Sequence, residues 1–206
     1  MSDARTRHNR ATYDRIAPAY DGNRTAVQPG GPAFPELQRD LLARLPATAV
    51  VADLGCGPGH DGARLHHAGL RVVGVDLSAG MLAIAAHRLG GGGAQGDLRE
   101  LPLRDAAVDA VWCAAALLHV PDDDTAAVVR GCRRVLRTEG VLALVTALGE
   151  GTVEEPVPYA SGESRWFVYR SPGAVVGALT DAGFDVVHVS EGQGNRRWGS
   201  FLAVAA

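Results

Sequence analysis

A glycine-rich stretch, ADLGCGPGHDG at residues 52–62, directly follows two valines. Such a stretch is typical of a strand that ends in a turn whose backbone can approach a ligand closely. The dinucleotide pattern GxGxxG fits three of its glycines, Gly57, Gly59 and Gly62. The pattern DxGxGxG fits an overlapping set, Asp53, Gly55, Gly57 and Gly59. The glycines alone do not distinguish a pyrophosphate from another nucleotide-like ligand.

Acidic residues stand at the ends of three successive expected strands, at Asp53, Asp76 and Asp97. Because the carboxyl ends of parallel strands lie at one edge of a sheet, we expect the three carboxylates to line one crevice. Asp76 can accept hydrogen bonds from two ribose hydroxyls, Asp97 from an adenine amine, and Asp53 can lie near a cationic amino-acid group. These carboxylates would repel a phosphate but tolerate a ligand with an ammonium and a sulfonium. Gly62 then becomes an incidental residue at a helix start.

The elements that would position these residues alternate between strand and helix from residue 49 onward. We expect five strands that end near residues 54, 76, 97, 114 and 146. The short turn EGQGN joins two further strands, 185–190 and 197–204, and so short a turn requires antiparallel strands. This pattern predicts an α/β fold with a mostly parallel seven-stranded sheet, helices on both faces and a C-terminal antiparallel hairpin.

Two segments lie outside this alternation within the single expected domain, 1–206. Residues 1–45 are expected to form an N-terminal helical lid, with a helix over 3–20 that Pro18 kinks or divides, a loop over 22–35 and a second helix. Residues 152–170 show no clear periodicity, and we expect an insertion that faces the substrate.

The composition excludes several classes of function. All 20 basic residues are arginine, so neither a Schiff-base lysine nor a P-loop lysine is available. The arginine, alanine and glycine bias indicates a bacterial genome of high GC content. A net charge of −3 does not favour nucleic acid, and three scattered cysteines without CxxC disfavour disulfides and zinc. Without a signal peptide or an apolar run of membrane-spanning length, we expect a cytoplasmic protein and no membrane partner.

Five stretches in this order resemble the class I S-adenosylmethionine-dependent methyltransferases. They are VVADLGCGPGHDG, VVGVDLSAGMLAIA, GDLRELPLRDAAVDAVWC, LLHV and RVLRTEGVLALV. The opening YDRIAPAYD is similar to the segment that folds over the cofactor in many small-molecule members. The resemblance covers most of the chain and implies a Rossmann-like fold, with S-adenosylmethionine as cofactor and S-adenosylhomocysteine as product.

The resemblance also implies roles for individual residues. The glycine turn would hold the methionine end of the cofactor, Asp76 its ribose and Leu77 with Met81 its adenine. Ala114 would lie near the sulfonium. The full set of expected cofactor-binding residues is Tyr13, Tyr20, Asp53, Gly55, Cys56, Gly57, Gly59, Asp76, Leu77, Met81, Gly96, Asp97, Leu98 and Ala114.

His119 follows the fourth strand, near the expected methyl group, and is the candidate catalytic base. The alternative is a loop histidine that bonds to backbone or lines the cofactor. Arg165 and Trp166 form a candidate substrate wall in which an arginine grips a carboxylate; alternatively, they belong to an edge strand that packs on the core. The expected substrate-binding residues are Tyr20, His119, Arg165 and Trp166, and no metal site is expected.

We therefore expect an enzyme that methylates an O, N or C atom of a small molecule, with secondary metabolism as one setting. The stretch CAAALLHV stands where amino-modifying nucleic-acid and protein enzymes carry NPPY or DPPY, and no Pro-Cys nucleophile is present. A protein that binds S-adenosylmethionine without methylating, or a cyclase, is the alternative, and a nicotinamide-dependent oxidoreductase is the third candidate. A monomer or homodimer is expected.

Overall fold

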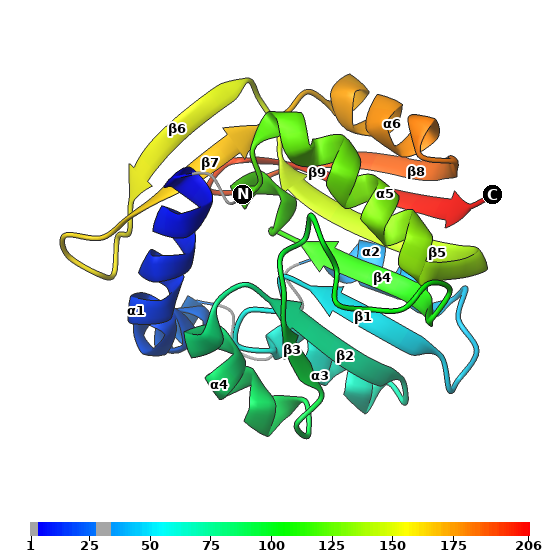
Figure 1. Cartoon of the computed structure of the whole chain (residues 1–206), viewed down its shortest axis with the longest axis horizontal. Coiled ribbons are helices and arrows are strands. Elements are labelled where there is room, and N and C mark those ends of the chain that lie inside the picture. Colours follow the sequence, from blue (N-terminus) through cyan, green and yellow to red (C-terminus); the bar gives the residue numbers. More distant parts are fainter. Residues whose placement is uncertain (1–3, 28–33) are drawn as a thin grey trace.

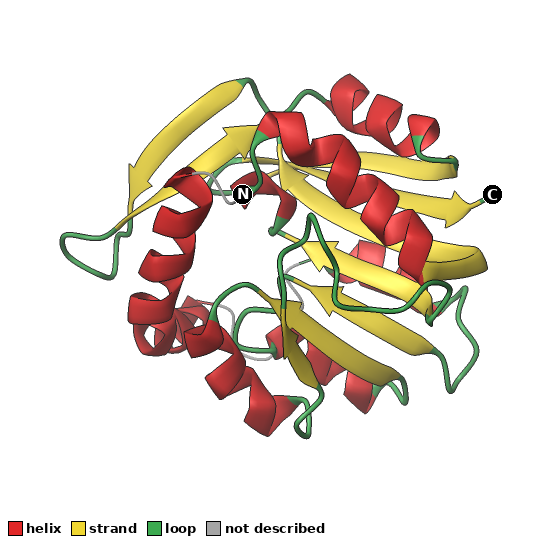
Figure 2. Ribbon diagram, in the orientation of Figure 1, coloured by secondary structure: helices red, strands yellow, loops and turns green. Residues whose placement is uncertain are grey.

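A seven-stranded sheet forms the centre of the molecule (Figures 1 and 2), in a computed structural model that describes residues 4–27 and 34–206. The strand order is β3-β2-β1-β4-β5-β9-β8. The first five are parallel, and β9 pairs antiparallel with both β5 and β8. The strands are β1 Val50–Leu54, β2 Arg71–Asp76, β3 Gly93–Gln95, β4 Val108–Ala114, β5 Leu136–Ala147, β8 Phe184–Gln193 and β9 Arg197–Ala205. The predicted α/β fold with a terminal antiparallel hairpin is confirmed.

Helices cover both faces of this sheet, as Figure 2 shows. On one face Leu41 of α2 and Leu65 of α3 pack with Trp112. On the other face Val129 of α5 and Leu179 of α6 belong to the larger apolar cluster. The helices are α1 Ala4–Val27, α2 Pro35–Leu42, α3 His60–His67, α4 Ala79–Arg88, α5 Thr125–Val135 and α6 Pro172–Asp181, with short 3-10 helices η1 Leu117–His119 and η2 Asp122–Asp124. Strands buried on both faces explain why β1 and β4 are almost continuously apolar.

Helix α1 runs across the carboxyl ends of the strands, in contact with α4 and β7 (Figure 1). Of the two outcomes predicted at Pro18, division of the helix is wrong, because one helix continues through it to Val27. Proline has no N–H to donate to the carbonyl of Asp14, four residues earlier. That carbonyl faces Gly80 of α4, where a Cβ would lie 2.7 Å from the Asp14 oxygen. The glycine thus makes room for the carbonyl that Pro18 leaves without its helical partner.

The expected loop over 22–35 is therefore shorter than predicted, since α1 covers its first part. Residues 1–3 and 28–33 of the expected lid lie outside the described residues. The segment 152–170 contains a separate antiparallel pair, β6 Gly151–Pro156 and β7 Ser164–Tyr169. The edge-strand alternative for Arg165 and Trp166 anticipated β7, whereas β6 was not predicted. In β7 two adjacent residues, Phe167 and Val168, are both buried, so the strand lacks the simple alternation that marks a half-buried strand.

Within the described part of the chain, no helix is long and apolar enough to cross a membrane. The same residues include no group of three or more His, Cys, Asp or Glu side chains that could hold a metal ion.

Candidate functional site

The turn after β1 presents bare backbone to a cavity. Gly55, Gly57 and Gly59 have φ angles of 67°, 52° and 83°, which favour glycine because other residues are strained there. A Cβ on Gly55 would lie 2.2 Å from the Cβ of Ala116. Gly57 lines the cavity, and a Cβ on Gly57 would meet no atom within 4 Å. Gly55 is therefore fixed by packing, whereas the space at Gly57 is free for a ligand.

The carboxylate of Asp76 holds this turn against the start of α4. Its Oδ2 accepts a hydrogen bond from the N–H of Gly57 at 2.8 Å, and its Oδ1 accepts one from the N–H of Ser78 at 2.8 Å. Asp76 lines the cavity, and burial raises the pKa of its carboxyl. Each carboxylate oxygen has a second lone pair, so both can still accept a bond from a ligand with two adjacent hydroxyls.

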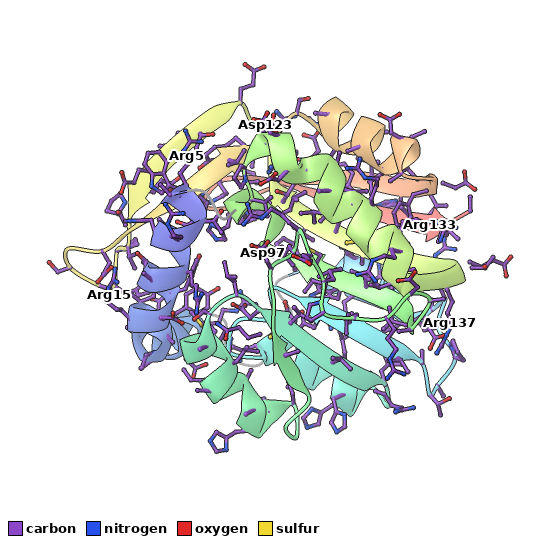
Figure 3. All side chains as sticks on the ribbon, in the orientation of Figure 1. Arg5, Arg15, Asp97, Asp123, Arg133 and Arg137 are labelled. Atoms are coloured by element: carbon purple, nitrogen blue, oxygen red, sulfur yellow. The ribbon has the colours of Figure 1, made fainter. Side chains whose placement is uncertain are left out.

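Asp97 forms the opposite side of the same cavity, and Figure 3 shows it near the centre of the view. Both of its oxygens accept hydrogen bonds from the Arg99 guanidinium, at 2.9 and 2.6 Å. Arg99 also donates to Asp124 at 2.8 Å. Partial burial alone would raise the pKa of Asp97, but the bonds from Arg99 hold it below its usual value. The carboxylate is thus fixed and ionised at the rim.

Two aspartates that the sequence analysis missed attach α1 over the cavity. Asp14 accepts hydrogen bonds from the Ser78 hydroxyl at 2.7 Å and the Gly80 N–H at 3.0 Å. Asp21 lies 2.8 Å from Nε2 of His60 and accepts a bond from Arg88 at 3.1 Å. Both follow a tyrosine in YDRIAPAYD, so the repeated Tyr-Asp pair, two helical turns apart, was the signal that could have found them.

His119 lies where α1, η1 and β7 meet. Its Nδ1 is 3.0 Å from the carbonyl oxygen of Trp166, and its Nε2 is 2.7 Å from the Tyr13 hydroxyl. A carbonyl can only accept, so Nδ1 carries the proton and Nε2 accepts from Tyr13. Burial lowers the pKa of His119 to about 4 and raises the pKa of Tyr13. The pair is therefore a neutral imidazole and a neutral phenol near pH 7.

Arg165 of β7 extends this cluster. Its Nη1 donates to the hydroxyls of Tyr13 at 3.2 Å and Tyr159 at 3.4 Å. Trp166, the next residue, binds α1 through its backbone. Its N–H donates to Asn9 at 2.7 Å and its carbonyl accepts from Asn9 at 2.9 Å, while Arg5 lies 5.3 Å above its ring. The main chain of Trp166 thus attaches α1 to β7. Of these two residues, Arg165 lines a cavity and Trp166 does not.

Two cavities share this region. The first lies between the strand ends and α1, and the second, of about 700 Å³, lies between α1, β7 and the β8–β9 turn. Six residues line both cavities: Tyr13, Tyr20, Arg24, Phe34, Ala115 and His119. The expected site residues that line the first cavity are Tyr13, Tyr20, Gly55, Cys56, Gly57, Asp76, Leu77, Met81, Asp97, Leu98, Ala114 and His119. Tyr20, His119 and Arg165 line the second. Arg24 and Arg99, which also line the first, were missed.

Four expected site residues lie away from both cavities: Asp53, Gly59, Gly96 and Trp166. Asp53 is buried beneath the turn, and burial raises its pKa well above the usual value. Gly59 and Gly96 serve close packing, because a Cβ would lie 3.2 Å from Ala85 in one case and 2.6 Å from Pro102 in the other.

Gly62 is a packing requirement and not an incidental residue. A Cβ there would lie 2.9 Å from Oδ2 of Asp53 and 2.6 Å from Cδ2 of Leu89. A larger residue would have to displace both side chains, so glycine lets α3 lie close to the buried carboxyl and to Leu89 at the end of α4.

Known proteins resemble this chain in sequence and in fold. A methyltransferase domain family model matches residues 52–144. A malonyl-[acyl-carrier protein] O-methyltransferase from Enterobacter lignolyticus is 35% identical over 151 residues, which are 70% of this chain and 55% of the relative. The chain spans about half the length of the first curated relatives it matches.

Solved structures share the fold over nearly the whole chain. The structure of DhpI in complex with SAH has a TM-score of 0.72, 25% identity and 98% coverage of each chain. The [4+2]-cyclase SpnF has a TM-score of 0.70 and 20% identity, covering 100% of this chain and 98% of its own. The second likeness shows the fold alone. By these comparisons residues 52–144 match a methyltransferase domain, and the chain has the fold of the class I S-adenosylmethionine-dependent methyltransferases, which it resembles over most of its length.

Proposed function

We propose that the protein transfers a methyl group from S-adenosylmethionine to a small molecule in the second cavity and releases S-adenosylhomocysteine. One observation carries this proposal: the first cavity, with the glycine turn and Asp76, adjoins the second, and Tyr13, Ala115 and His119 line both. We call this shared stretch the opening. A methyl transfer needs a donor and an acceptor on opposite sides of one opening, and most of its catalysis comes from positioning and exclusion of water.

The residues present fit the cofactor. The open space at Gly57 lets a ligand lie against the backbone, and Asp76 has free lone pairs for two ribose hydroxyls. We assign the methionine end to Gly55, Cys56 and Gly57. The adenine would lie between Leu77, Met81, Asp97 and Leu98, with Ala114 near the sulfonium and Tyr13 and Tyr20 closing the lid. Asp53, Gly59 and Gly96 would support these groups from behind the wall.

On the acceptor side we assign Tyr20, His119 and Arg165. His119 is the candidate catalytic residue, but its Nε2 already accepts the Tyr13 hydroxyl, so its proposed task is to hold that hydroxyl at the opening. Trp166 would act through its carbonyl on His119 and Asn9. The bound cofactor supplies a methyl group on a good leaving group, and these residues orient the acceptor toward it.

Oxygen is the acceptor atom that the relatives favour, since the malonyl-[acyl-carrier protein] and ubiquinone biosynthesis relatives are named O-methyltransferases. We propose a biosynthetic role, with secondary metabolism as one setting, for a bacterial, cytoplasmic monomer or homodimer. Nothing in the cavities favours a nucleic-acid partner.

Calorimetry of the purified protein with S-adenosylhomocysteine and, separately, with NADH tests the cofactor assignment. We expect micromolar binding of the first and none of the second. Binding of NADH without S-adenosylhomocysteine would refute the proposal and favour an oxidoreductase. Transfer of isotopically labelled methyl from the donor to a product separates a methyltransferase from a cyclase or a binding protein, which would leave the label on the donor.

A further inference from the structure

Arg165 is a cation without a carboxylate partner at the wall of the second cavity. Among the described residues, no Asp or Glu oxygen lies within ion-pair distance of its guanidinium. Its hydrogen bonds go to two neutral phenols, and its Nε is buried with no hydrogen-bond partner. A partly buried guanidinium is normally paired, so this one has unused capacity for an anion.

The other arginines that line this cavity each have a carboxylate partner, although Arg24 shares Asp61 with Arg64. Arg24 lies 3.5 Å from Asp61, and Arg196 lies 3.1 Å from Glu155. Glu191 lies 2.5 Å from Arg197. Glu36 stands exposed on the rim at the start of α2. Arg165 is therefore the wall cation left to recognise an anionic group of a ligand.

The described residues at the opening between the cavities offer no free base. Both ring nitrogens of His119 have partners, and the Tyr13 phenol, which burial keeps neutral, already donates to His119. Asp61, a carboxylate that lines the first cavity, is paired with Arg24 and Arg64. An acceptor hydroxyl or ammonium must lose a proton to react, whereas a carboxylate is already a nucleophile near neutral pH.

The remaining walls indicate the body of the acceptor. Aromatic rings line part of the cavity, beside the polar turn between β8 and β9, and the volume of about 700 Å³ falls in the range of about 300–1,000 Å³ usual for ligand pockets. The rings belong to Tyr13, Tyr20, Phe34, Tyr159, Phe167 and Trp198. Such walls favour an aromatic or other apolar skeleton.

We propose that the acceptor is a carboxylic acid with an aromatic or apolar body, that Arg165 binds its carboxylate, and that this carboxylate is the group methylated. The inference rests on the proposed methyltransferase function and names its substrate class. Nη1 of Arg165 bonds to Tyr13, which lines both cavities, so an anion on Arg165 lies one hydrogen bond from the opening.

The reaction balances without a proton. One carboxylate oxygen forms a bond to the methyl carbon, while the bond from that carbon to sulfur breaks and its electron pair stays on sulfur. The negative carboxylate and the positive sulfonium become a neutral methyl ester and a neutral thioether. No base is needed, which agrees with the state of Tyr13 and His119.

The test uses matched pairs of probes with the protein saturated with S-adenosylhomocysteine: cinnamate against cinnamyl alcohol, phenylacetate against 2-phenylethanol, and indole-3-acetate against tryptophol. In calorimetry we expect at least one carboxylate to bind about 10-fold or more tighter than its alcohol, as a charge-assisted bidentate pair allows. With labelled methyl donor, the product should release its label as methanol in dilute base, as a methyl ester does and an ether does not.

Arg165→Gln should abolish the preference for the carboxylate, and Arg165→Lys should restore part of it. Arg137→Gln is the matched control, because Arg137 pairs with Asp109 at the opposite end of the sheet (Figure 3) and should behave as wild type. Affinity for S-adenosylhomocysteine should stay within about 2-fold in all three variants, which also shows that they fold.

Four outcomes would each overturn the carboxylate assignment while leaving the proposed methyltransferase function intact. They are equal binding of acids and alcohols, a carboxylate preference that survives Arg165→Gln, no binding by any of the three acids, and a base-stable product. Failure of the wild type to bind S-adenosylhomocysteine would instead refute the proposed function on which the assignment rests.

Discussion

The two sides of the opening are built differently. On the cofactor side, the contacts run between backbone groups and carboxylates close in sequence: Asp76 binds the N–H of Gly57, 19 residues away, and that of Ser78, two residues away. On the acceptor side, the contacts join side chains far apart in sequence. Tyr13 and His119 are separated by 106 residues, and Tyr13 and Arg165 by 152.

This difference explains which substitutions each side of the opening can tolerate. A turn held by backbone hydrogen bonds keeps its shape when neighbouring side chains vary, so one cofactor can be bound by many sequences. The acceptor side depends on rings and one guanidinium that α1 and β7 bring together, so a single substitution there changes the shape and charge of the cavity. Three comparisons between variants test this contrast.

Asp76→Ala should give the largest effect and should act on the cofactor side alone. It removes the acceptor of two ligand hydroxyls and of two backbone N–H groups. Since each bond to a charged group contributes about 1.5–3 kcal/mol, we expect the affinity for S-adenosylhomocysteine to fall by about 100-fold or more, measured by calorimetry. Asp97→Asn, at a carboxylate already paired with Arg99, is the control and should cost far less. Affinity within about 3-fold of wild type in Asp76→Ala would remove Asp76 from the cofactor site.

His119→Gln should change the acid stability of the acceptor side. The folded pKa is lowered to about 4 from 6.5, so the unfolded chain takes up the proton first as pH falls. The stability that neutral His119 contributes is therefore complete above pH 6.5 and is lost between pH 6.5 and 4. The shift corresponds to about 3 kcal/mol at most, and glutamine keeps one donor for Trp166 and one acceptor for Tyr13.

Urea unfolding of both proteins at pH 7 and pH 4 measures this effect. Wild type should lose more stability than His119→Gln between the two pH values, by up to about 3 kcal/mol. The raised carboxyls Asp53 and Asp76 act in the opposite direction, since their contribution is present at low pH and lost as pH rises. They are common to both proteins and cancel. Equal losses would show that His119 is protonated in the folded protein at pH 4 to 6.5.

The same contrast governs how much could be predicted from the sequence. The sheet, its terminal hairpin and the wall residues Gly57 and Asp76 follow from local signals, because strand periodicity and glycine turns are properties of short segments. Met81 was named only through the family resemblance. Local signals did not distinguish residues that line the cavity from residues that support its wall. Asp53 and Asp76 both end a strand, yet one is buried under the turn and the other faces the cavity, and only the packing of α3 decides between them.

The acceptor side was less predictable because its elements are defined by tertiary contacts. Nothing local shows that β7 lies beside α1, that Asn9 holds the Trp166 backbone, or that Pro18 is accommodated by Gly80. His119 and Arg165 could be named as candidates from their positions. Their relation through Tyr13, which turns a candidate base into a hydrogen-bonded neutral pair, needed three-dimensional coordinates.

Gly57→Ala and Gly59→Ala give the smallest effect and the sharpest comparison, because the two glycines are neighbours in one turn and both have positive φ. Each alanine should cost about 1–2 kcal/mol of folding stability through backbone strain. Gly59→Ala should cost somewhat more, since its Cβ meets Ala85 at 3.2 Å, whereas the Cβ of Gly57→Ala enters open space. We place the cofactor in that open space, so Gly57→Ala should weaken the binding of S-adenosylhomocysteine by about 10-fold, near 1.4 kcal/mol. Gly59→Ala should leave this affinity almost unchanged.

Calorimetry measures the affinity for S-adenosylhomocysteine, and thermal unfolding measures the folding stability, so together they separate the two effects. The contrary result is that Gly59→Ala weakens ligand binding as much as Gly57→Ala at similar folding stability. In that case ligand binding would depend on the shape of the whole turn and not on the space at Gly57, and the distinction between glycines that line the cavity and glycines that support its wall would fail.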